Sequence, residues 1–160
     1  MKKLLVLSDS HGARDSMLEA VRVEQPDYIF HLGDHIRDCE WLREQVGKIP
    51  VLGVVGNCDY HAPGPEQILN TIEGVRIFGC HGHAYHVKYS LMRLRYAAME
   101  QGAALCLFGH THQPYLMEMD GLTLMNPGSC GGTAPCYGIV TLSDGIAQCS
   151  LCRLPFKKEE

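Results

Sequence analysis

The first third of the chain alternates short apolar runs with segments of helical periodicity, and this alternation restricts the fold more than any other feature. Residues 3–7, 27–32 and 50–55 are apolar runs with the length of β-strands. Residues 13–23 and 36–46 place apolar side chains at helical spacing. Strands that alternate with helices favour a parallel sheet, because each helix returns the chain to the edge where the next strand starts. We therefore expect an α/β fold with a parallel sheet that is covered on both faces.

The rest of the chain is richer in tight turns. Asp120 and Gly121 lie between two apolar runs, as do Asp144 and Gly145, and such dipeptides are typical of β-hairpins. The expected elements here are strands at residues 68–72, 75–78, 104–108, 115–119, 122–125, 137–142 and 146–154, and a helix at residues 91–101. No repeat and no long linker interrupts the sequence, so we expect a single domain over residues 1–160.

Composition excludes several classes of protein. The chain has 46% hydrophobic and 20% charged residues over 160 positions, which is typical of a globular domain. Its 14 Lys and Arg residues against 18 Asp and Glu residues leave a formal net charge of −4, so we expect no stable nucleic-acid binding. No run approaches the roughly 20 apolar residues that cross a bilayer, and Ser8 and Asp9 interrupt the opening run before it reaches the length of a signal-peptide core. We expect a cytoplasmic protein without membrane contact.

The 8 cysteines are scattered along a chain that is large enough to fold without disulfides. Cys149 and Cys152 form a Cys-x-x-Cys pair, but the second pair that a structural zinc site requires is missing. We therefore expect reduced thiols and no zinc site of this kind.

Polar side chains follow five of the expected strands, each time beside a glycine. The five segments are residues 8–11, 32–35, 56–59, 79–83 and 109–112. In an α/β sheet, ligands bind beyond the carboxyl ends of the strands. These strand ends therefore predict a functional site made of carboxylate, amide and imidazole groups.

The spacing of these groups indicates metal binding. Asp9 and His11 are two residues apart, as are His110 and His112, so each pair points to one side of an extended backbone. Imidazole suits Zn, Fe and Mn, and carboxylate suits Mn and Mg. The carboxylate, amide and imidazole groups at the five strand ends supply seven candidate ligands. They exceed what one ion with an open position takes, so we expect two ions that share a carboxylate, about 3.5–4 Å apart.

In this order, the segments resemble the motifs of the calcineurin-like metallophosphoesterases. The resemblance covers residues 1 to about 130, and it is closest to a small bacterial and archaeal phosphodiesterase branch that has Asn-Pro-Gly-Ser after the last motif, here residues 126–129. It implies a two-sheet sandwich flanked by helices, in α-β-β-α layers. It also implies a small-molecule phosphoester as substrate.

The resemblance assigns roles to individual residues. One metal ion is held by Asp9, His11 and His112, the other is held by Asn57, His81 and His110, and Asp34 bridges the two. Mn is the favoured metal, and Fe, Zn, Ni or Co also fits these ligands. In the family, a hydroxide between the two ions attacks phosphorus.

One position departs from many phosphatases of the superfamily, which have a histidine after the Asn of the third motif. This chain has Cys58 there, followed by Asp59, as the phosphodiesterase branch does. A thiol with a pKa near 8.5 is a poor substitute for that imidazole. We therefore expect phosphodiesterase activity, with His83 or His35 as the proton donor to the leaving group. The remaining candidates are Asp59 as a catalytic acid and Asn57, Cys58 and Asn126 as substrate contacts. For Asn126, bracing of the metal loops and a plain turn are the alternatives.

Other functions stay open at this point. A phosphomonoesterase acting on a small metabolite or nucleotide would use the same ligands. A non-catalytic scaffold with this fold, or a redox sensor that uses Cys58 or Cys80, belongs to a different class, and a scaffold predicts missing ligands. A homo-oligomer is compatible with the sequence.

Overall fold

The computed structural model describes residues 1–155 of the chain as two five-stranded sheets and three α-helices. The first sheet contains β1 (Lys2–Leu7), β2 (Tyr28–His31), β3 (Val51–Gly53), β9 (Cys136–Ser143) and β10 (Ile146–Arg153). The second contains β4 (Gln67–Ile72), β5 (Val75–Cys80), β6 (Leu105–Leu107), β7 (Tyr115–Met119) and β8 (Leu122–Asn126). The helices are α1 (Arg14–Glu24), α2 (Ile36–Gln45) and α3 (Met92–Glu100), and η1 (His83–Tyr85) is a single 3₁₀ turn.

The strands run in the order β10-β9-β1-β2-β3 and β4-β5-β6-β8-β7. Within the first sheet β1, β2 and β3 are parallel, and within the second sheet β5, β6 and β8 are parallel. The strands of the hairpins pair antiparallel, as the turn sequences predict. The predicted boundaries agree with the structure to within about two residues at most ends.

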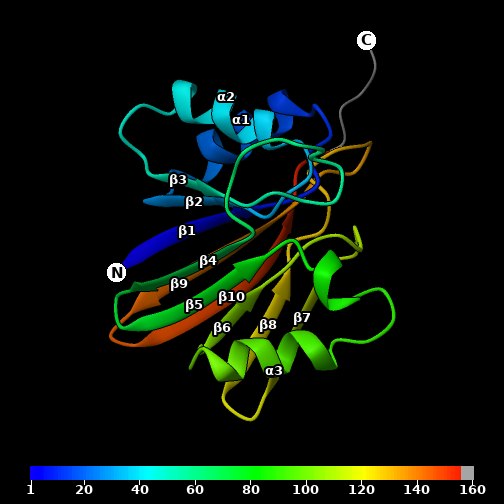
Figure 1. Cartoon of the computed structure of the whole chain (residues 1–160). Coiled ribbons are helices and arrows are strands. Elements are labelled where there is room, and N and C mark those ends of the chain that lie inside the picture. Colours follow the sequence, from blue (N-terminus) through cyan, green and yellow to red (C-terminus); the bar gives the residue numbers. More distant parts are fainter. Residues whose placement is uncertain (156–160) are drawn as a thin grey trace.

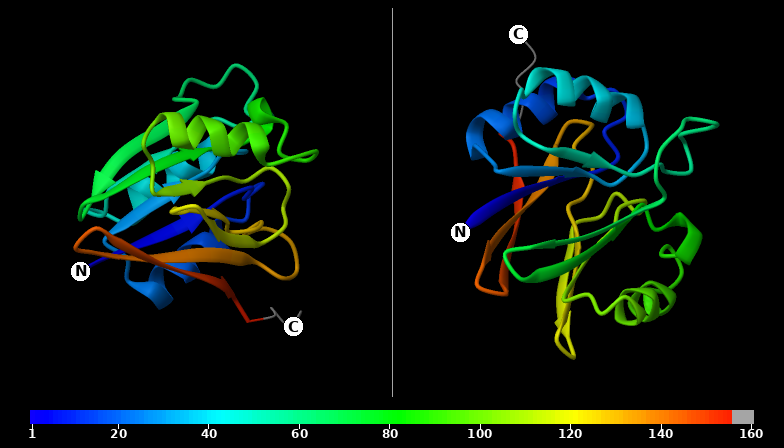
Figure 2. Two further views of the ribbon diagram at one scale, coloured as in Figure 1. Left: turned by 90° about the horizontal axis from the view of Figure 1, so that it is seen from below. Right: turned by 60° about the vertical axis from the view of Figure 1, so that its left-hand side comes forward.

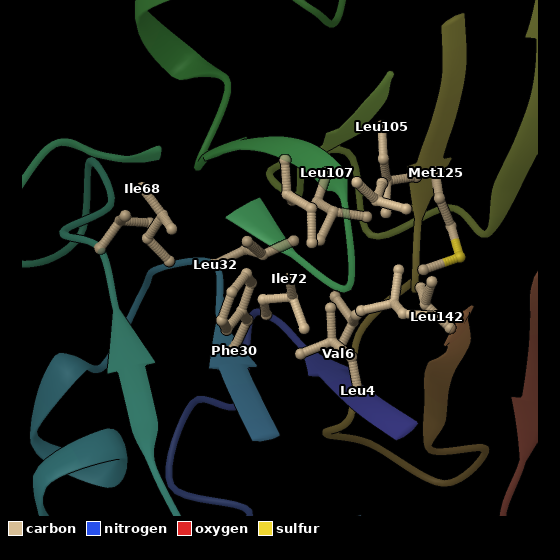
Figure 3. Close-up of a cluster of buried hydrophobic side chains, with 14 residues drawn as sticks. Leu4, Val6, Phe30, Leu32, Ile68, Ile72, Leu105, Leu107, Met125 and Leu142 are labelled. Carbon is tan, nitrogen blue, oxygen red and sulfur yellow. The ribbon is translucent and has the colours of Figure 1, made fainter. Parts of the chain in front are cut away.

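The two sheets pack face to face, with α1 and α2 on the outer face of the first sheet and α3 on the outer face of the second (Figures 1 and 2). Figure 3 shows the inner core, where Val6 and Phe30 of the first sheet meet Ile72 and Leu107 of the second. Separate apolar clusters lie under α1 and α2 and under α3. The layers are therefore α-β-β-α, as the family resemblance implies. Each sheet is covered on both faces, as predicted: helices cover the outer face and the other sheet covers the inner face. The sheets are mixed rather than purely parallel, because each also contains antiparallel hairpin strands.

Cys149 and Cys152 lie on different faces of β10. Cys149 packs against the inner core and Cys152 against the apolar cluster under α1 and α2. All 8 cysteines lie within the described residues and are free thiols, so this pair forms no disulfide. Within residues 1–155, no helix combines the length and the apolar character needed to cross a membrane.

Candidate metal centre

Five loops meet at one end of the sandwich, and each follows a strand of a parallel pair. They are residues 8–13 after β1, 32–35 after β2, 54–66 after β3, 81–91 after β5 and 108–114 after β6. Three of these strands belong to the first sheet and two to the second. The loops of both sheets therefore contribute side chains to one site.

Asp9, His11, Asp34 and His112 form the first group of side chains. One donor atom of each lies within 4.8 Å of the others. Nε2 of His112 is 3.1 Å from Oδ1 of Asp9, and Nε2 of His11 is 3.8 Å from Oδ2 of Asp34. Both carboxylates are buried and both imidazoles are exposed. The group is an Asp/His cluster that can hold a metal ion and is open to solvent on its histidine side.

His81 is the centre of a second group beside the first. Its Nε2 atom lies 3.0 Å from Oδ1 of Asn57, 3.4 Å from Oδ1 of Asp34 and 3.9 Å from Oδ1 of Asp9. The ring of His110 lies 5.0 Å from that of His81, centroid to centroid. Because Oδ2 of Asp34 faces His11 while Oδ1 faces His81, Asp34 lies between the two groups.

The position of the proton on His81 follows from its other hydrogen bond. Nδ1 is 2.8 Å from the carbonyl oxygen of Leu32, which can only accept, so Nδ1 carries a proton and donates it. In neutral His81, Nε2 then has no proton, and its lone pair faces three oxygen acceptors. A cation between these atoms relieves their mutual repulsion, and a backbone carbonyl that orients a ligating imidazole is typical of metal sites.

Asp9 gives a second indication that the donor set fits a metal. Its Oδ2 atom accepts hydrogen bonds from Ser8 Oγ at 2.6 Å and from the His110 amide at 3.1 Å. Oδ1 is buried and has no hydrogen-bond partner among the described residues, although His112 lies close to it. A buried carboxylate oxygen without a donor is costly, and a bound cation would satisfy it.

The electrostatics favour the ligating forms of two donors, Asp34 and His110. Burial opposes ionisation of Asp34, but the Cys58 amide and the His81 and His11 imidazoles outweigh it, so the pKa of Asp34 is lowered. Desolvation and the neighbouring His81 lower the pKa of His110. Asp34 is therefore an anion and His110 a neutral imidazole at neutral pH.

The loops hold these residues in an uncommon backbone conformation. The left-handed region is occupied by Asp9, His11, Asp34, His35, His110 and His112, with φ between 45° and 72°. Non-glycine residues adopt this region at a cost, and such residues cluster at functional sites. Gly33 has φ of 102°, and a Cβ atom there would lie 2.8 Å from Nδ1 of His81, so this position requires glycine.

A family model described as the calcineurin-like phosphoesterase superfamily domain matches residues 1–145. The chain belongs to this superfamily. A probable metallophosphoesterase of Methanothermobacter thermautotrophicus is 35% identical over 130 residues, which cover 78% of this chain and 74% of that protein. The phosphodiesterase YfcE of Escherichia coli K12 is 29% identical, over 88% of both chains.

Solved structures agree with this membership. A Streptococcus pneumoniae protein described as a predicted phosphoesterase superposes with a TM-score of 0.80 at 29% identity and covers 95% of this chain and 89% of its own. Vacuolar protein sorting 29 of Entamoeba histolytica, complexed with Zn²⁺, has a TM-score of 0.77 at 17% identity and covers 94% of this chain and 98% of its own. At that identity the likeness shows the fold alone. Membership in the superfamily and the phosphodiesterase relatives support a metal-binding phosphoesterase hydrolase.

The predicted proton donors of this phosphoesterase lie at the open side of the site. His83 is exposed, with its ring 5.4 Å from that of His81 and 6.2 Å from that of His110. Desolvation and the nearby His81 lower the pKa of His83. His35 is also exposed, and its ring lies 4.9 Å from that of His11. The two imidazoles are therefore next to different groups of the site.

The other predicted residues have mainly supporting positions. Asp59 accepts hydrogen bonds from the amides of Ile36 and Gly56, so it joins the start of α2 to the loop after β3. Cys58 is exposed, and its amide donates to Asp34 at 2.9 Å. Desolvation, followed by the nearby Asp34 carboxylate, raises the pKa of its thiol.

Asn126, predicted to contact the substrate, has no access to it in this structure. Its side chain is fully buried, and its amide donates to the Gly109 carbonyl and to Thr111 Oγ1, each at 3.0 Å. Its Oδ1 atom accepts from the Gly128 amide. Asn126 therefore braces the loop of His110 and His112, because all its polar atoms are used there.

A buried network that the sequence analysis missed joins the loops of Asp9 and Asp34. Ser10 Oγ lies 2.9 Å from Nε2 of His31 and donates to Oδ2 of Asp38 at 2.7 Å. Nδ1 of His31 accepts from the Gly33 amide, so Nε2 carries the proton of the neutral ring. The only signal in the sequence is an acidic residue, Asp38, on the apolar side of a helix. His31 is thus a fully buried histidine with a partner at each ring nitrogen.

Proposed function

We propose that this protein is a metal-dependent phosphodiesterase that cleaves a small phosphodiester at a dinuclear centre. The observation that carries the proposal is the position of Asp34, whose two carboxylate oxygens face His11 on one side and His81 on the other. A carboxylate between two sets of donors is the arrangement by which two ions share a ligand. Metallophosphoesterase membership supports the same chemistry.

The ligands divide between the two groups of side chains. Asp9, His11 and His112 would hold one ion and Asn57, His81 and His110 the other, with Asp34 bridging. Mn is our first candidate, and Fe, Zn, Ni or Co also suits imidazole with carboxylate. When bound, two such ions supply an activated water as nucleophile and neutralise the charge that develops at phosphorus.

The residues of the chain prepare the site for this reaction. The loops fix the donors before the substrate arrives, so little reorganisation remains for the reaction itself. A cavity of about 530 Å³ next to His11 and His112 gives a small phosphoester room beside the cluster. We propose His83 as the proton donor to the leaving oxygen, because it is exposed beside the second group, and His35 as the alternative at the first group.

Cys58 favours a diester over a monoester. The thiol occupies the place in the third loop where many phosphatases of the superfamily carry an imidazole. Since its pKa is raised, it stays protonated at neutral pH and is a weaker proton donor than an imidazolium. Cleavage of a dianionic monoester with a poor leaving group depends strongly on such a donor.

The test is metal analysis combined with a panel of substrates. Metal-free protein is loaded with Mn²⁺, Zn²⁺, Fe²⁺, Ni²⁺ or Co²⁺, and the bound equivalents are counted. Hydrolysis of bis(nitrophenyl) phosphate is then compared with that of nitrophenyl phosphate. We expect two equivalents and a preference for the diester. A preference for the monoester would point to a phosphomonoesterase, and binding of metal without hydrolysis of any ester would point to a scaffold.

A further inference from the structure

An exposed aromatic pocket lies beside the candidate metal centre. Tyr85, Tyr89 and Tyr96 line a cavity of about 480 Å³ between η1, the loop at residues 86–91 and the N-terminal half of α3. Tyr89 is 91% exposed and Tyr96 is 61% exposed. We call this cavity the tyrosine pocket; its other lining residues are His86, Ser90, Met92 and Arg93.

The core uses Tyr85 only in part, and Tyr89 and Tyr96 are not among the side chains packed against it. Helix α3 buries Leu94 and Ala98 against the second sheet. Met92 and Tyr96 are four residues apart and so share the opposite, solvent-facing side of the helix. Large aromatic side chains gathered at one exposed place mark a binding site more often than isolated ones do.

The tyrosine pocket is adjacent to the candidate metal centre. Tyr85 also lines a smaller cavity of about 80 Å³, together with His81 and His83. The Tyr85 ring packs edge-on against Phe78 at 6.2 Å between centroids, which holds it in place between the two cavities. The two cavities therefore adjoin, with the Tyr85 side chain in the lining of both.

The charges around the tyrosine pocket suit an anionic ligand. Among the described residues, its lining includes Arg93 and His86 but no aspartate or glutamate. Lys88 lies in the loop that forms one side of the pocket. The acidic side chain of Glu66 belongs to the lining of the smaller cavity and not to that of the tyrosine pocket.

We infer that the tyrosine pocket binds the nucleobase of a nucleotide phosphodiester whose phosphate lies at the Asp/His cluster. Nucleobases stack on tyrosine and arginine faces, and the cationic side chains attract the phosphate. An aliphatic diester, such as a glycerophosphodiester, would leave the aromatic faces unused. The inference rests on the proposed function and adds the chemical class of the substrate.

The test compares two diesters in the Mn²⁺-loaded protein. The dinucleoside monophosphate ApA carries bases, whereas glycerophosphoethanolamine does not. Replacing Tyr89 or Tyr96 by Ala should lower kcat/KM for ApA about tenfold and change that for the aliphatic diester less than twofold. Tyr89→Phe should keep the activity, since it retains the aromatic face. Ile146→Ala, an exposed apolar position on β10, is the control and should change neither.

A binding measurement separates this inference from the proposed function. AMP is titrated into metal-free protein and followed by NMR. We expect shifts at the tyrosines of the pocket, weakened in Tyr89→Ala. If AMP shifts none of them, or if the Ala variants lose both diesters equally, the inference is overturned while the phosphodiesterase proposal stands. If no diester is cleaved in any metal but AMP still binds these tyrosines, the proposed function fails and the base-binding pocket is supported.

Discussion

Nε2 of His112 lies 3.1 Å from Oδ1 of Asp9 without making a hydrogen bond to it. Imidazole nitrogen and carboxylate oxygen are both metal-ligand atoms, and at this separation the two can bind one ion. The carboxylate of Asp34 also lies within 4.8 Å, so the metal-free site concentrates negative charge. The Asp9 carboxylate should therefore favour metal binding but lower the stability of the metal-free fold.

We expect Asp9→Asn to stabilise the metal-free protein and to lower its activity with metal. The amide removes one charge next to Asp34, so the free energy of unfolding of the metal-free protein should rise by about 1 kcal/mol. Diester hydrolysis should fall about 10²–10³-fold, because a ligand is lost. Denaturant unfolding with a chelator measures the first effect and an assay in Mn²⁺ the second. Full activity in Asp9→Asn would show that Asp9 is not a metal ligand.

His81→Ala should remove one metal ion and leave the other. The Asp9, His11, Asp34 and His112 group remains complete in this variant. We expect the bound metal to fall from two equivalents to one and hydrolysis to fall about 10²-fold or more. Elemental analysis counts the metal, and circular dichroism checks that the fold persists. Two equivalents in the variant would contradict the proposed role of His81.

Asp38→Asn should weaken metal binding from outside the ligand set. Asp38 accepts hydrogen bonds from Ser10 and from the Gly12 amide, both at 2.7 Å, and so fixes the loop that carries Asp9 and His11. An amide cannot accept at every position that the carboxylate uses. We expect metal affinity about 10–100-fold lower by calorimetric titration. Asp144→Asn, at an exposed turn, is the control and should bind metal like the wild type.

His31 should make the fold sensitive to acid. Complete burial lowers the pKa of His31 to about 4, so the unfolded state takes up the proton first as the pH falls. Below about pH 6.5 the free energy of unfolding should therefore decrease toward pH 4, by at most about 1.4 kcal/mol per pH unit from this group. Denaturant unfolding of metal-free protein across this range measures it. His31→Gln should have a shallower slope, and an unchanged slope would show that other groups cause the acid sensitivity.

Cys58→His should shift the substrate preference. An imidazole at this exposed position can donate a proton to the leaving oxygen of a monoester at neutral pH, which the thiol does poorly. We expect the rate on nitrophenyl phosphate to rise about tenfold or more relative to the diester. Cys58→Ser, with no comparable donor, is the matched control. An equal ratio of monoester to diester rate in both variants would show that the side chain at position 58 does not determine the substrate preference.

The apolar runs and turn residues of the sequence were enough to predict the helices and strands, because these patterns are local. The runs after Lys3 and after Asp27 also predicted that Asp9 and Asp34 follow strands, since a polar Ser-Asp or Gly-Asp pair ends each apolar run visibly. The family motifs added the two-sheet arrangement and the ligand set. Periodicity alone did not predict that arrangement, because strand β1 is apolar on both faces whether a helix or a second sheet covers it.

What only the tertiary structure decided is how the side chains meet. His81 donates a hydrogen bond to the Leu32 carbonyl, and Asp34 lies between two histidines; both relationships join residues from different loops. Oδ1 of Asp9 is buried without a hydrogen-bond partner among residues 1–155, which also depends on how the loops pack. The same holds for Asn126, which looks like a substrate contact in the sequence but is buried as a brace. Sequence determines which chemical groups each loop carries. Their distances, their protonation and their access to solvent depend on the packing of the two sheets, which no local pattern encodes.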